Sequence, residues 1–223
     1  MLDASIASLP CGVARRMNIT LEEFERDYLD KLPVVFSDLG ANAAFRDRCD
    51  RARLVQEWGN HEITLSSANS YSYDKERTTL AHYVADMMGP QDERDGRHTF
   101  YHFGDHQPSF TLLDAYVLPR VHRGQTPSLS WGLAGDVSGV PFHVHGPVYA
   151  EVLHGRKHWL ITAPDERPQF DPDEPPVHWM QRYLAGNQPQ PGLMQCTLQP
   201  GEILYVRLPI ALHDCRWCLS LSC

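Results

Sequence analysis

The sequence predicts a mainly β fold, in which a small β-barrel follows an N-terminal extension of helices and short strands. One observation is a change of pattern near residue 99. Beyond it, short apolar runs alternate with Gly, Pro and Asp, which is typical of sandwiches and barrels and not of alternating βαβ units. A second observation is the helical spacing of apolar residues before that point. We therefore expect an α/β extension at residues 1–98 that packs on a barrel at residues 99–223.

Size and composition suit one globular core with such an extension. The 223 residues are 42% hydrophobic and 22% charged, which is sufficient for a buried core. The net charge of −8 argues against nucleic-acid binding, which requires a basic face. No apolar run approaches the roughly 18 residues of a membrane span. The first residues, MLDASIASLPCG, lack the basic start and the long apolar stretch of a signal peptide.

The extension contains signals for both helices and strands. Thr20 and Glu23 form a capping box, so a helix is predicted over residues 20–29. Residues 32–39, LPVVFSDL, predict a short buried strand. Further along, the sequence predicts two short helices, then a strand, then a helix that ends at Gly89-Pro90; these lie at residues 41–58, 61–74 and 79–90.

Seven short strands are predicted in the barrel region. Each is a run of β-branched, aromatic or aliphatic residues bounded by turn residues; the runs are TFYHF, LSWGLAG, GVPFHVH, YAEVLHG, HWLITAP, MQCTL and GEILYV. A Pro-rich segment at residues 169–192 interrupts them and includes a helical stretch around residues 179–184.

Six cysteines raise the question of disulfides: Cys11, Cys49, Cys196, Cys215, Cys218 and Cys223. A single C-x-x-C without a second pair is weak evidence for a zinc or redox site. Because a chain of this length does not need a disulfide framework, we favour reduced or incidental cysteines over a disulfide. Asn18-Ile19-Thr20 is a glycosylation sequon that would matter only in a secretory compartment, and the capping role of Thr20 is better supported.

Two histidines one residue apart, His143 and His145, form the strongest candidate for a metal site. Alternate residues of a strand face the same side, so both imidazoles can reach one metal ion if a third ligand comes from another strand. His213, which follows PGEILYVRLPIAL, is the candidate for that ligand. Neutral imidazole suits iron, zinc, copper or nickel. A chance pair is the alternative in a chain with 12 histidines. Five further histidines are interpreted as surface or packing residues: His98, His102, His106, His154 and His158.

These motifs together resemble the jumonji-C (JmjC) family. In that family a double-stranded β-helix, a cupin-like jelly-roll barrel, carries His-x-Asp/Glu, then Gly-x-Lys before an aromatic residue, then a distant His after Pro-Gly-Asp/Glu. The corresponding segments here are His143-Val144-His145, residues 155–159 (GRKHW), Pro200-Gly201-Glu202 and His213. The segments LPVVFSDL, NSYSYDK, TFYHFGDH and SWGLAGDVSGVPFHVHGP extend the resemblance, towards small members that consist of the JmjC domain alone, over about residues 11–213.

The resemblance implies a non-haem Fe(II), 2-oxoglutarate-dependent oxygenase. In such a site two histidines and one carboxylate hold the metal. Lys157 matches the lysine that pairs with the distal carboxylate of 2-oxoglutarate, and Tyr101 matches a tyrosine that hydrogen-bonds the same carboxylate. The alternative for Lys157 is a solvated lysine at the end of a strand.

Three departures from the family pattern weaken that implication. His145 stands where the family has Asp or Glu, and Val140 stands where it often has a hydroxyl. After PGEILYV, the segment RLPIALH replaces the expected Pro and Trp-x-His. The last residues, CRWCLSLSC, are a poor match to a closing strand, so we expect an alternative or truncated C-terminus after about His213.

Three functions remain open at this point. The first is a JmjC-fold regulatory or binding module with a degenerate metal site, which His145 and Val140 favour. The second is an Fe(II)/2-oxoglutarate-dependent protein hydroxylase, and the third is a cupin-like enzyme with a three-histidine metal site. A protein is the expected partner or substrate. The resemblance further implies the endoplasmic-reticulum lumen and a group-level link to NF-κB signalling.

Overall fold

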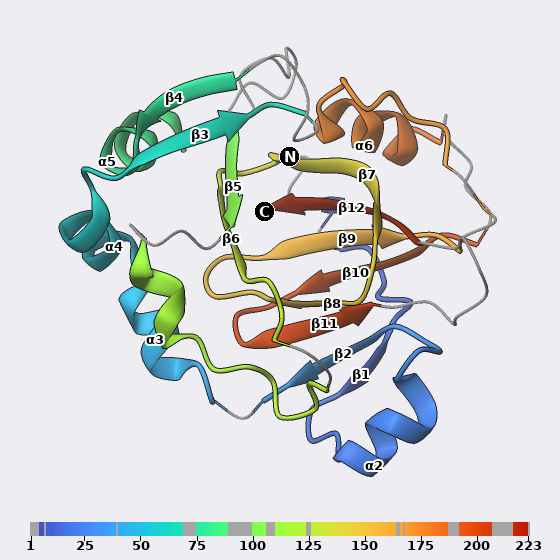
Figure 1. Cartoon of the computed structure of the whole chain (residues 1–223). Helices are drawn as coiled ribbons and strands as arrows, with labels where there is room; N and C mark the ends of the chain where they lie inside the picture. The colour runs from blue at the N-terminus through green and yellow to red at the C-terminus, as the bar shows by residue number, and fades with distance from the viewer. Residues whose placement is uncertain are drawn as a thin grey trace.

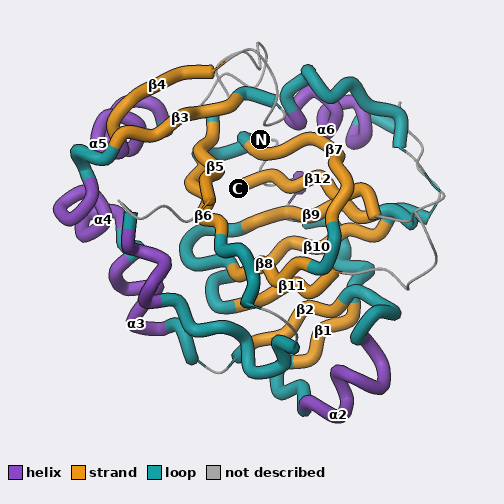
Figure 2. The backbone as a smooth tube through the Cα atoms, viewed as in Figure 1, coloured by secondary structure: helices purple, strands orange, loops and turns teal. Residues whose placement is uncertain are grey.

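Three four-stranded sheets dominate the computed structural model (Figures 1 and 2). It describes the backbone alone for residues 105, 144, 145 and 216–222, and backbone and side chains for residues 5–6, 8–38, 40–68, 75–88, 100–104, 110–123, 126–143, 146–163, 166, 168–186 and 192–206. Within the described part, no helix combines the length and the apolar character that a membrane span demands.

The structure confirms that Thr20 caps the first helix through its side chain. The Glu23 amide donates to Thr20 Oγ1 over 3.1 Å and starts helix α2, Leu21–Glu23, which continues as a π-helical turn, Phe24–Tyr28. The Glu23 carboxylate accepts from Arg16 Nε at 3.1 Å. The buried strand predicted next is β2, Val34–Ser37, and it pairs in parallel with β1, Ala14–Arg16.

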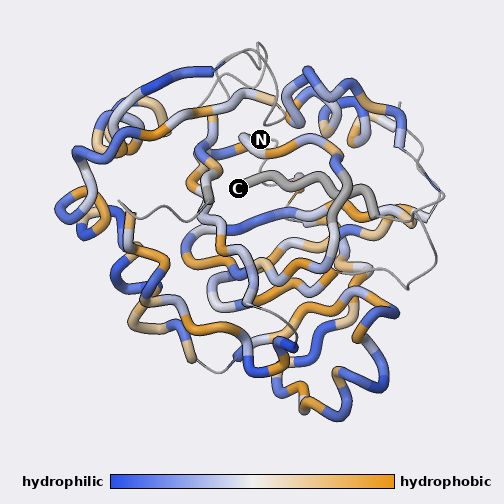
Figure 3. Tube along the Cα trace, in the orientation of Figure 1, coloured by the Kyte–Doolittle hydropathy of each residue, from blue (hydrophilic) through white to orange (hydrophobic). Residues whose placement is uncertain are grey.

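The rest of the extension contains the predicted helices and one strand that the sequence did not predict. The two short helices are α3, Ala43–Arg48, and α4, Arg51–Trp58. Strand β3, Glu62–Ser66, and helix α5, Leu80–His82, with its π-helical continuation Tyr83–Met87, are also confirmed. Gly89-Pro90 lies outside the described residues. The unpredicted strand is β4, Lys75–Thr79, whose sequence KERTT is hydrophilic throughout because it forms an edge of its sheet (Figure 3).

All seven strands predicted in the barrel region are present. They are β5, Tyr101–Asp105; β6, Ser130–Ala134; β7, Gly139–His145; β8, Val148–Glu151; β9, Lys157–Ile161; β10, Met194–Leu198; and β11, Glu202–Val206. A 3₁₀ turn, Thr111–Ala115, follows β5, and the predicted helical stretch is α6, Pro176–Leu184.

The interpretation of the last residues as a poor closing strand is wrong. Strand β12, Arg216–Ser222, pairs antiparallel with β7 on one side and with β9 on the other. Its sequence, RWCLSLS, alternates apolar and polar residues, which is the strand pattern itself. The departure from the expected family ending hid that pattern.

Strands of the extension and of the barrel region share sheets. Sheet A has the order β1-β2-β11-β8, sheet B the order β4-β3-β5-β6 and sheet C the order β10-β9-β12-β7. In sheet A, β2 lies between β1 and β11; in sheet B, β3 lies between β4 and β5. The division of the chain near residue 98 stays a prediction.

Sheets A and C pack face to face. One core cluster combines Val35 and Leu204 of sheet A with Trp159, Ile161 and Leu198 of sheet C. The other face of sheet A is covered by the π-helical turn, and the other face of sheet C by α6. A separate core joins α3 and α4 to sheet B. The fold is thus mainly β, with open sheets and helices around them.

Candidate functional site

His143 has the hydrogen bond that a metal-ligating histidine typically makes. The side chain is half-buried on β7, and its Nδ1 lies 2.8 Å from the carbonyl oxygen of Pro141. A carbonyl oxygen only accepts, so in the neutral ring Nδ1 carries the proton and Nε2 keeps the lone pair. Bonds of this kind orient histidines toward a metal. The side chain of His145 and all of His213 lie outside the described residues, so a three-histidine site stays a prediction.

Strand pairing places His143 and Lys157 on one face of sheet C. Cys218 of β12 lies opposite both His143 of β7 and Ile161 of β9, and residues opposite each other face the same side. Lys157 and Trp159 share that side with Ile161, because side chains alternate along a strand. Since Trp159 and Ile161 belong to the core between sheets A and C, this is the inner face of sheet C.

The environment of Lys157 is aromatic. Its Nζ lies 4.6 Å from the ring centroid of Trp159, a cation–π distance. Trp159 is 3% exposed, and its buried indole Nε1 has no hydrogen-bond partner among the side chains and backbone that the structure describes. Binding of a 2-oxoglutarate carboxylate by Lys157 stays a prediction.

Tyr101 belongs to a different sheet. It lies on β5 of sheet B, is 2% exposed, and its hydroxyl donates to the carbonyl oxygen of Ala68. Lys157, by contrast, lies in sheet C. The role predicted for Tyr101, a hydrogen bond to the same carboxylate, therefore stays a prediction.

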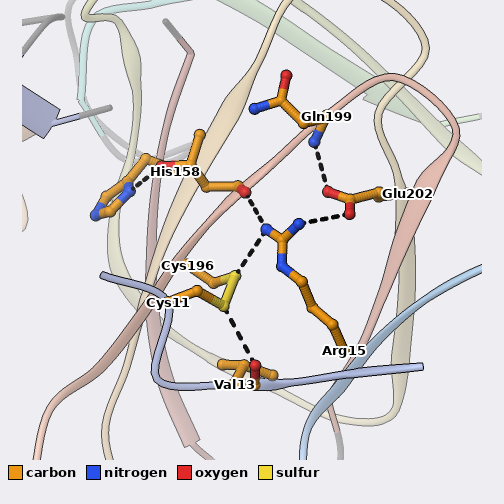
Figure 4. Close-up of a disulfide and its surroundings, with 8 residues drawn as sticks. Cys11, Val13, Arg15, His158, Cys196, Gln199 and Glu202 are labelled. Atoms are coloured by element: carbon orange, nitrogen blue, oxygen red, sulfur yellow. Dashed lines mark hydrogen bonds and ion pairs between the residues drawn. A yellow bond between two sulfur atoms is a disulfide. The ribbon is translucent and has the colours of Figure 1, made fainter. Parts of the chain in front are cut away.

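Glu202 of the Pro-Gly-Glu segment has a structural role at a junction between sheets A and C (Figure 4). Its Oε2 accepts from the Gln199 amide at 2.8 Å, which holds the turn before β11. Its Oε1 accepts from Arg15 Nη1 at 2.6 Å, and the carboxylate is almost fully buried. The same guanidinium donates through Nη2 to the Thr197 carbonyl oxygen and to Cys196 Sγ. Arg15 thus joins β1 of sheet A to β10 of sheet C.

A disulfide between Cys11 and Cys196 reinforces this junction (Figure 4). Cys196 is fully buried in the core between sheets A and C, and the Gly12 amide donates to the Gln195 carbonyl oxygen at 2.8 Å. In residues 8–13, the N-terminal strap, Cys11 and Gly12 thus lie against the edge strand β10 before the chain enters β1. The preference for reduced or incidental cysteines is wrong for this pair. Nothing in the local sequence indicates the pairing, because 185 residues separate the two cysteines.

Three of the remaining histidines are packing or surface residues, as expected: His158 and His102 pack against their neighbours, and His154 is exposed. His158 is fully buried, with Nδ1 2.9 Å from Thr197 Oγ1. His102 donates from Nδ1 to the Thr64 carbonyl oxygen, and His154 Nε2 lies 2.6 Å from the Arg46 carbonyl oxygen. Burial lowers the pKa of His102, and it lowers that of His158 to about 4. His98 and His106 lie outside the described residues.

His158 is expected to make the protein less stable at mildly acidic pH. The unfolded state binds a proton below the ordinary histidine pKa of 6.5, whereas the folded state does so only near 4. The free energy of unfolding therefore keeps its full contribution from the neutral His158 ring above pH 6.5. This contribution decreases as the pH falls toward 4, by roughly 3 kcal/mol in total. Urea unfolding at several pH values measures this slope. His158→Gln should flatten it, and an unchanged slope in that variant would show that His158 is not the titrating group.

The residues of the site fit a metal bound by imidazole better than the iron of an oxygenase. The neutral ring of His143 has its lone pair on Nε2, as a metal ligand must have on one ring nitrogen. However, residue 145 supplies an imidazole where the oxygenase pattern needs a carboxylate, and Val140 supplies no hydroxyl. Among the side chains that the structure describes, no three His, Cys, Asp or Glu residues are grouped as a metal site requires. The donor set therefore does not match the two-histidine, one-carboxylate centre.

Similarity to known proteins extends over most of the chain, although no family model matches it. The chain is 38% identical over 199 residues to JmjC domain-containing protein 8 of Rattus norvegicus. The matched region covers 87% of this chain and 74% of the rat protein. The human protein of the same name is 38% identical over 201 residues, with 87% and 75% covered. The lysine-specific demethylase JMJ21 of Arabidopsis thaliana is 27% identical over 224 residues, 23% of its own length. Because the two mammalian relatives match over most of their length, the chain belongs to the JmjC family, in the group of JmjC domain-containing protein 8.

Proposed function

We propose that this protein is a JmjC-fold regulatory or binding module of the endoplasmic-reticulum lumen, with a degenerate metal site. In this proposal sheets A and C are the two halves of the cupin-like barrel, and the partner is a protein. A link to NF-κB signalling is part of the proposal at the level of the group. The observation that carries it is the Cys11–Cys196 disulfide.

The disulfide supports a location in the secretory pathway. Disulfides persist in oxidising compartments and are rare in the cytosol, where thiols are kept reduced. Cys196 is fully buried and its sulfur accepts a hydrogen bond from Arg15 Nη2 at 3.3 Å, whereas Cys11 is exposed, so the disulfide attaches an exposed N-terminal segment to the core.

The donor set supports recognition over catalysis. With histidine at position 145, the predicted ligands are three neutral imidazoles, so an Fe(II) ion would lack the anionic ligand of the oxygenase centre. Lys157 already has an interaction partner on the inner face, the Trp159 ring. The net charge of −8 favours a protein partner over nucleic acid.

Proximity labelling in the lumen tests the proposal. The full chain, fused to a labelling enzyme and directed to the lumen, is compared with its His143→Ala variant. We expect the same set of labelled proteins for both, together with an intact Cys11–Cys196 disulfide in alkylation mass mapping. His82→Ala, which removes an exposed imidazole paired with Asp86, is the matched control. A labelled set that changes with His143→Ala but not with His82→Ala would contradict a function independent of metal, and a reduced Cys11–Cys196 pair would contradict the compartment.

A 2-oxoglutarate-dependent protein hydroxylase is the second candidate. The observation in its favour is that His143 and Lys157 share the inner face of sheet C, with His143 Nδ1 hydrogen-bonded as in a metal ligand. Such an enzyme would convert 2-oxoglutarate to succinate when iron is present, and His143→Ala would abolish the conversion. A three-histidine zinc site would instead copurify with zinc and not respond to 2-oxoglutarate.

A further inference from the structure

We propose that Asn18 carries an N-linked glycan. Asn18-Ile19-Thr20 is the single Asn-x-Ser/Thr sequon of the chain. Asn18 is exposed in the turn between β1 and α2, whereas its neighbour Ile19 is fully buried. The Ile19 carbonyl oxygen accepts from Arg120 Nη2 at 3.0 Å. The turn is thus anchored through Ile19, and the Asn18 side chain lies where a glycan meets solvent.

The capping role of Thr20 does not compete with glycosylation. In the folded protein, Thr20 Oγ1 accepts from the Glu23 amide. A sequon is recognised in an extended chain during translocation, before a cap can form. The hydroxyl of Thr20 therefore serves recognition first and the cap of α2 afterwards.

The modification is a group transfer without change of oxidation state. The donor is an oligosaccharide linked through pyrophosphate to a membrane lipid. A bond forms between Asn18 Nδ2 and the anomeric carbon, and the bond from that carbon to the pyrophosphate oxygen breaks. The lipid pyrophosphate leaves with the electron pair, and the amide nitrogen loses one proton. The product is a neutral, bulky, solubilising substituent on the surface.

A glycan at this position would lie beside an open sheet edge. Strand β1 is the terminal strand of sheet A, and all three of its residues are exposed. Open edges invite pairing with other chains, and proteins protect them by covering them. Asn18 follows the last residue of β1, Arg16, by two positions. The glycan would therefore shield that edge.

This inference rests on the luminal location proposed above, because the transfer occurs only inside the secretory pathway. The test uses the full chain expressed behind a secretory leader in mammalian cells and analysed by gel mobility with and without peptide-N-glycosidase. We expect the wild type to lose the mass of one glycan on digestion. Asn18→Gln should migrate with the digested protein and not respond to the enzyme. Thr20→Ser keeps both sequon and cap and should retain the glycan.

A new sequon provides the control that separates the two proposals. Asn60 and Glu62 are both exposed, so Asn18→Gln combined with Glu62→Thr moves the sequon to Asn60, with a residue that suits a strand. If this variant is glycosylated and the wild type is not, the glycan at Asn18 is excluded while the luminal location stands. If neither is glycosylated, the glycan at Asn18 is excluded, while the luminal location, which the added leader supplies here, is decided separately by the oxidation state of the Cys11–Cys196 pair. A shift in the wild type that Asn18→Gln removes supports the glycan.

Discussion

Replacing Cys11 and Cys196 together with alanine is expected to lower the free energy of unfolding by about 2–5 kcal/mol. The cross-link joins residues 185 positions apart, so its loss gives the unfolded chain a large additional conformational freedom. In the folded state it also releases the N-terminal strap from β10, although Arg15 and the Gly12–Gln195 hydrogen bond remain. Urea unfolding followed by tryptophan fluorescence measures the effect.

Cys49→Ala is the matched control for this experiment. Cys49 is a free, buried thiol whose pKa is raised to about 12 by burial, so it stays protonated and outside the cross-link. Its replacement should cost only about 1 kcal/mol, the value for a small loss of packing. Dithiothreitol should destabilise the wild type and Cys49→Ala but leave the double variant unchanged. Equal stabilities of wild type and double variant under oxidising conditions would rule out the disulfide.

Arg46→Ala is expected to cost about 3 kcal/mol, the lower end of what removal of one partner from a buried ion pair costs, because the Arg46 side chain is 22% exposed. Arg46 Nη1 donates to Glu151 Oε1 at 2.9 Å, and the Glu151 side chain is 5% exposed. Asn42 Nδ2 donates to Glu151 Oε2 at 2.7 Å, but it is neutral and cannot balance the charge. Burial and the Glu151 carboxylate also raise the pKa of Tyr116. The pair connects α3 to β8, so its loss weakens the contact between the extension and sheet A.

Arg48→Ala tests whether burial causes this cost. Arg48 belongs to the same helix, α3, and pairs with Glu57, but both side chains are well exposed. Exposed pairs contribute about 0–1 kcal/mol, so Arg48→Ala should be nearly neutral. Thermal unfolding of the two variants gives the comparison directly. Equal losses for Arg46→Ala and Arg48→Ala would contradict a specific role of the buried pair.

Local patterns were sufficient to predict most elements of the fold. Thr20 caps α2, and the β-strand residue pattern of residues 139–145 and 157–161 predicted β7 and β9. Both signals depend only on residues that are close together in the sequence. Strand β4 was missed because an edge strand needs no apolar residues. Strand β12 was missed because its sequence differs from the ending expected in the JmjC family. That difference was given more weight than the alternation of apolar and polar residues in RWCLSLS.

Long-range features could not be predicted in the same way. The Cys11–Cys196 pair and the Arg15–Glu202 contact join residues far apart in the sequence, and only the topology of sheets A and C brings them together. The shared face of His143 and Lys157 likewise depends on β12 lying between β7 and β9. The sequence indicated both residues as candidates for the site, a role that stays a prediction, but it did not indicate the strand that lies between them.

Metal content and 2-oxoglutarate binding test the central claim most directly. The protein, purified from the secretory pathway of its expression host, is analysed by elemental mass spectrometry and then titrated anaerobically with 2-oxoglutarate in a calorimeter, with Fe(II) present. Wild type and His143→Ala are compared. A recognition module with a degenerate site predicts less than stoichiometric iron and no heat of 2-oxoglutarate binding in either protein. Stoichiometric iron with micromolar 2-oxoglutarate binding, both lost in His143→Ala, would contradict that account and identify an oxygenase.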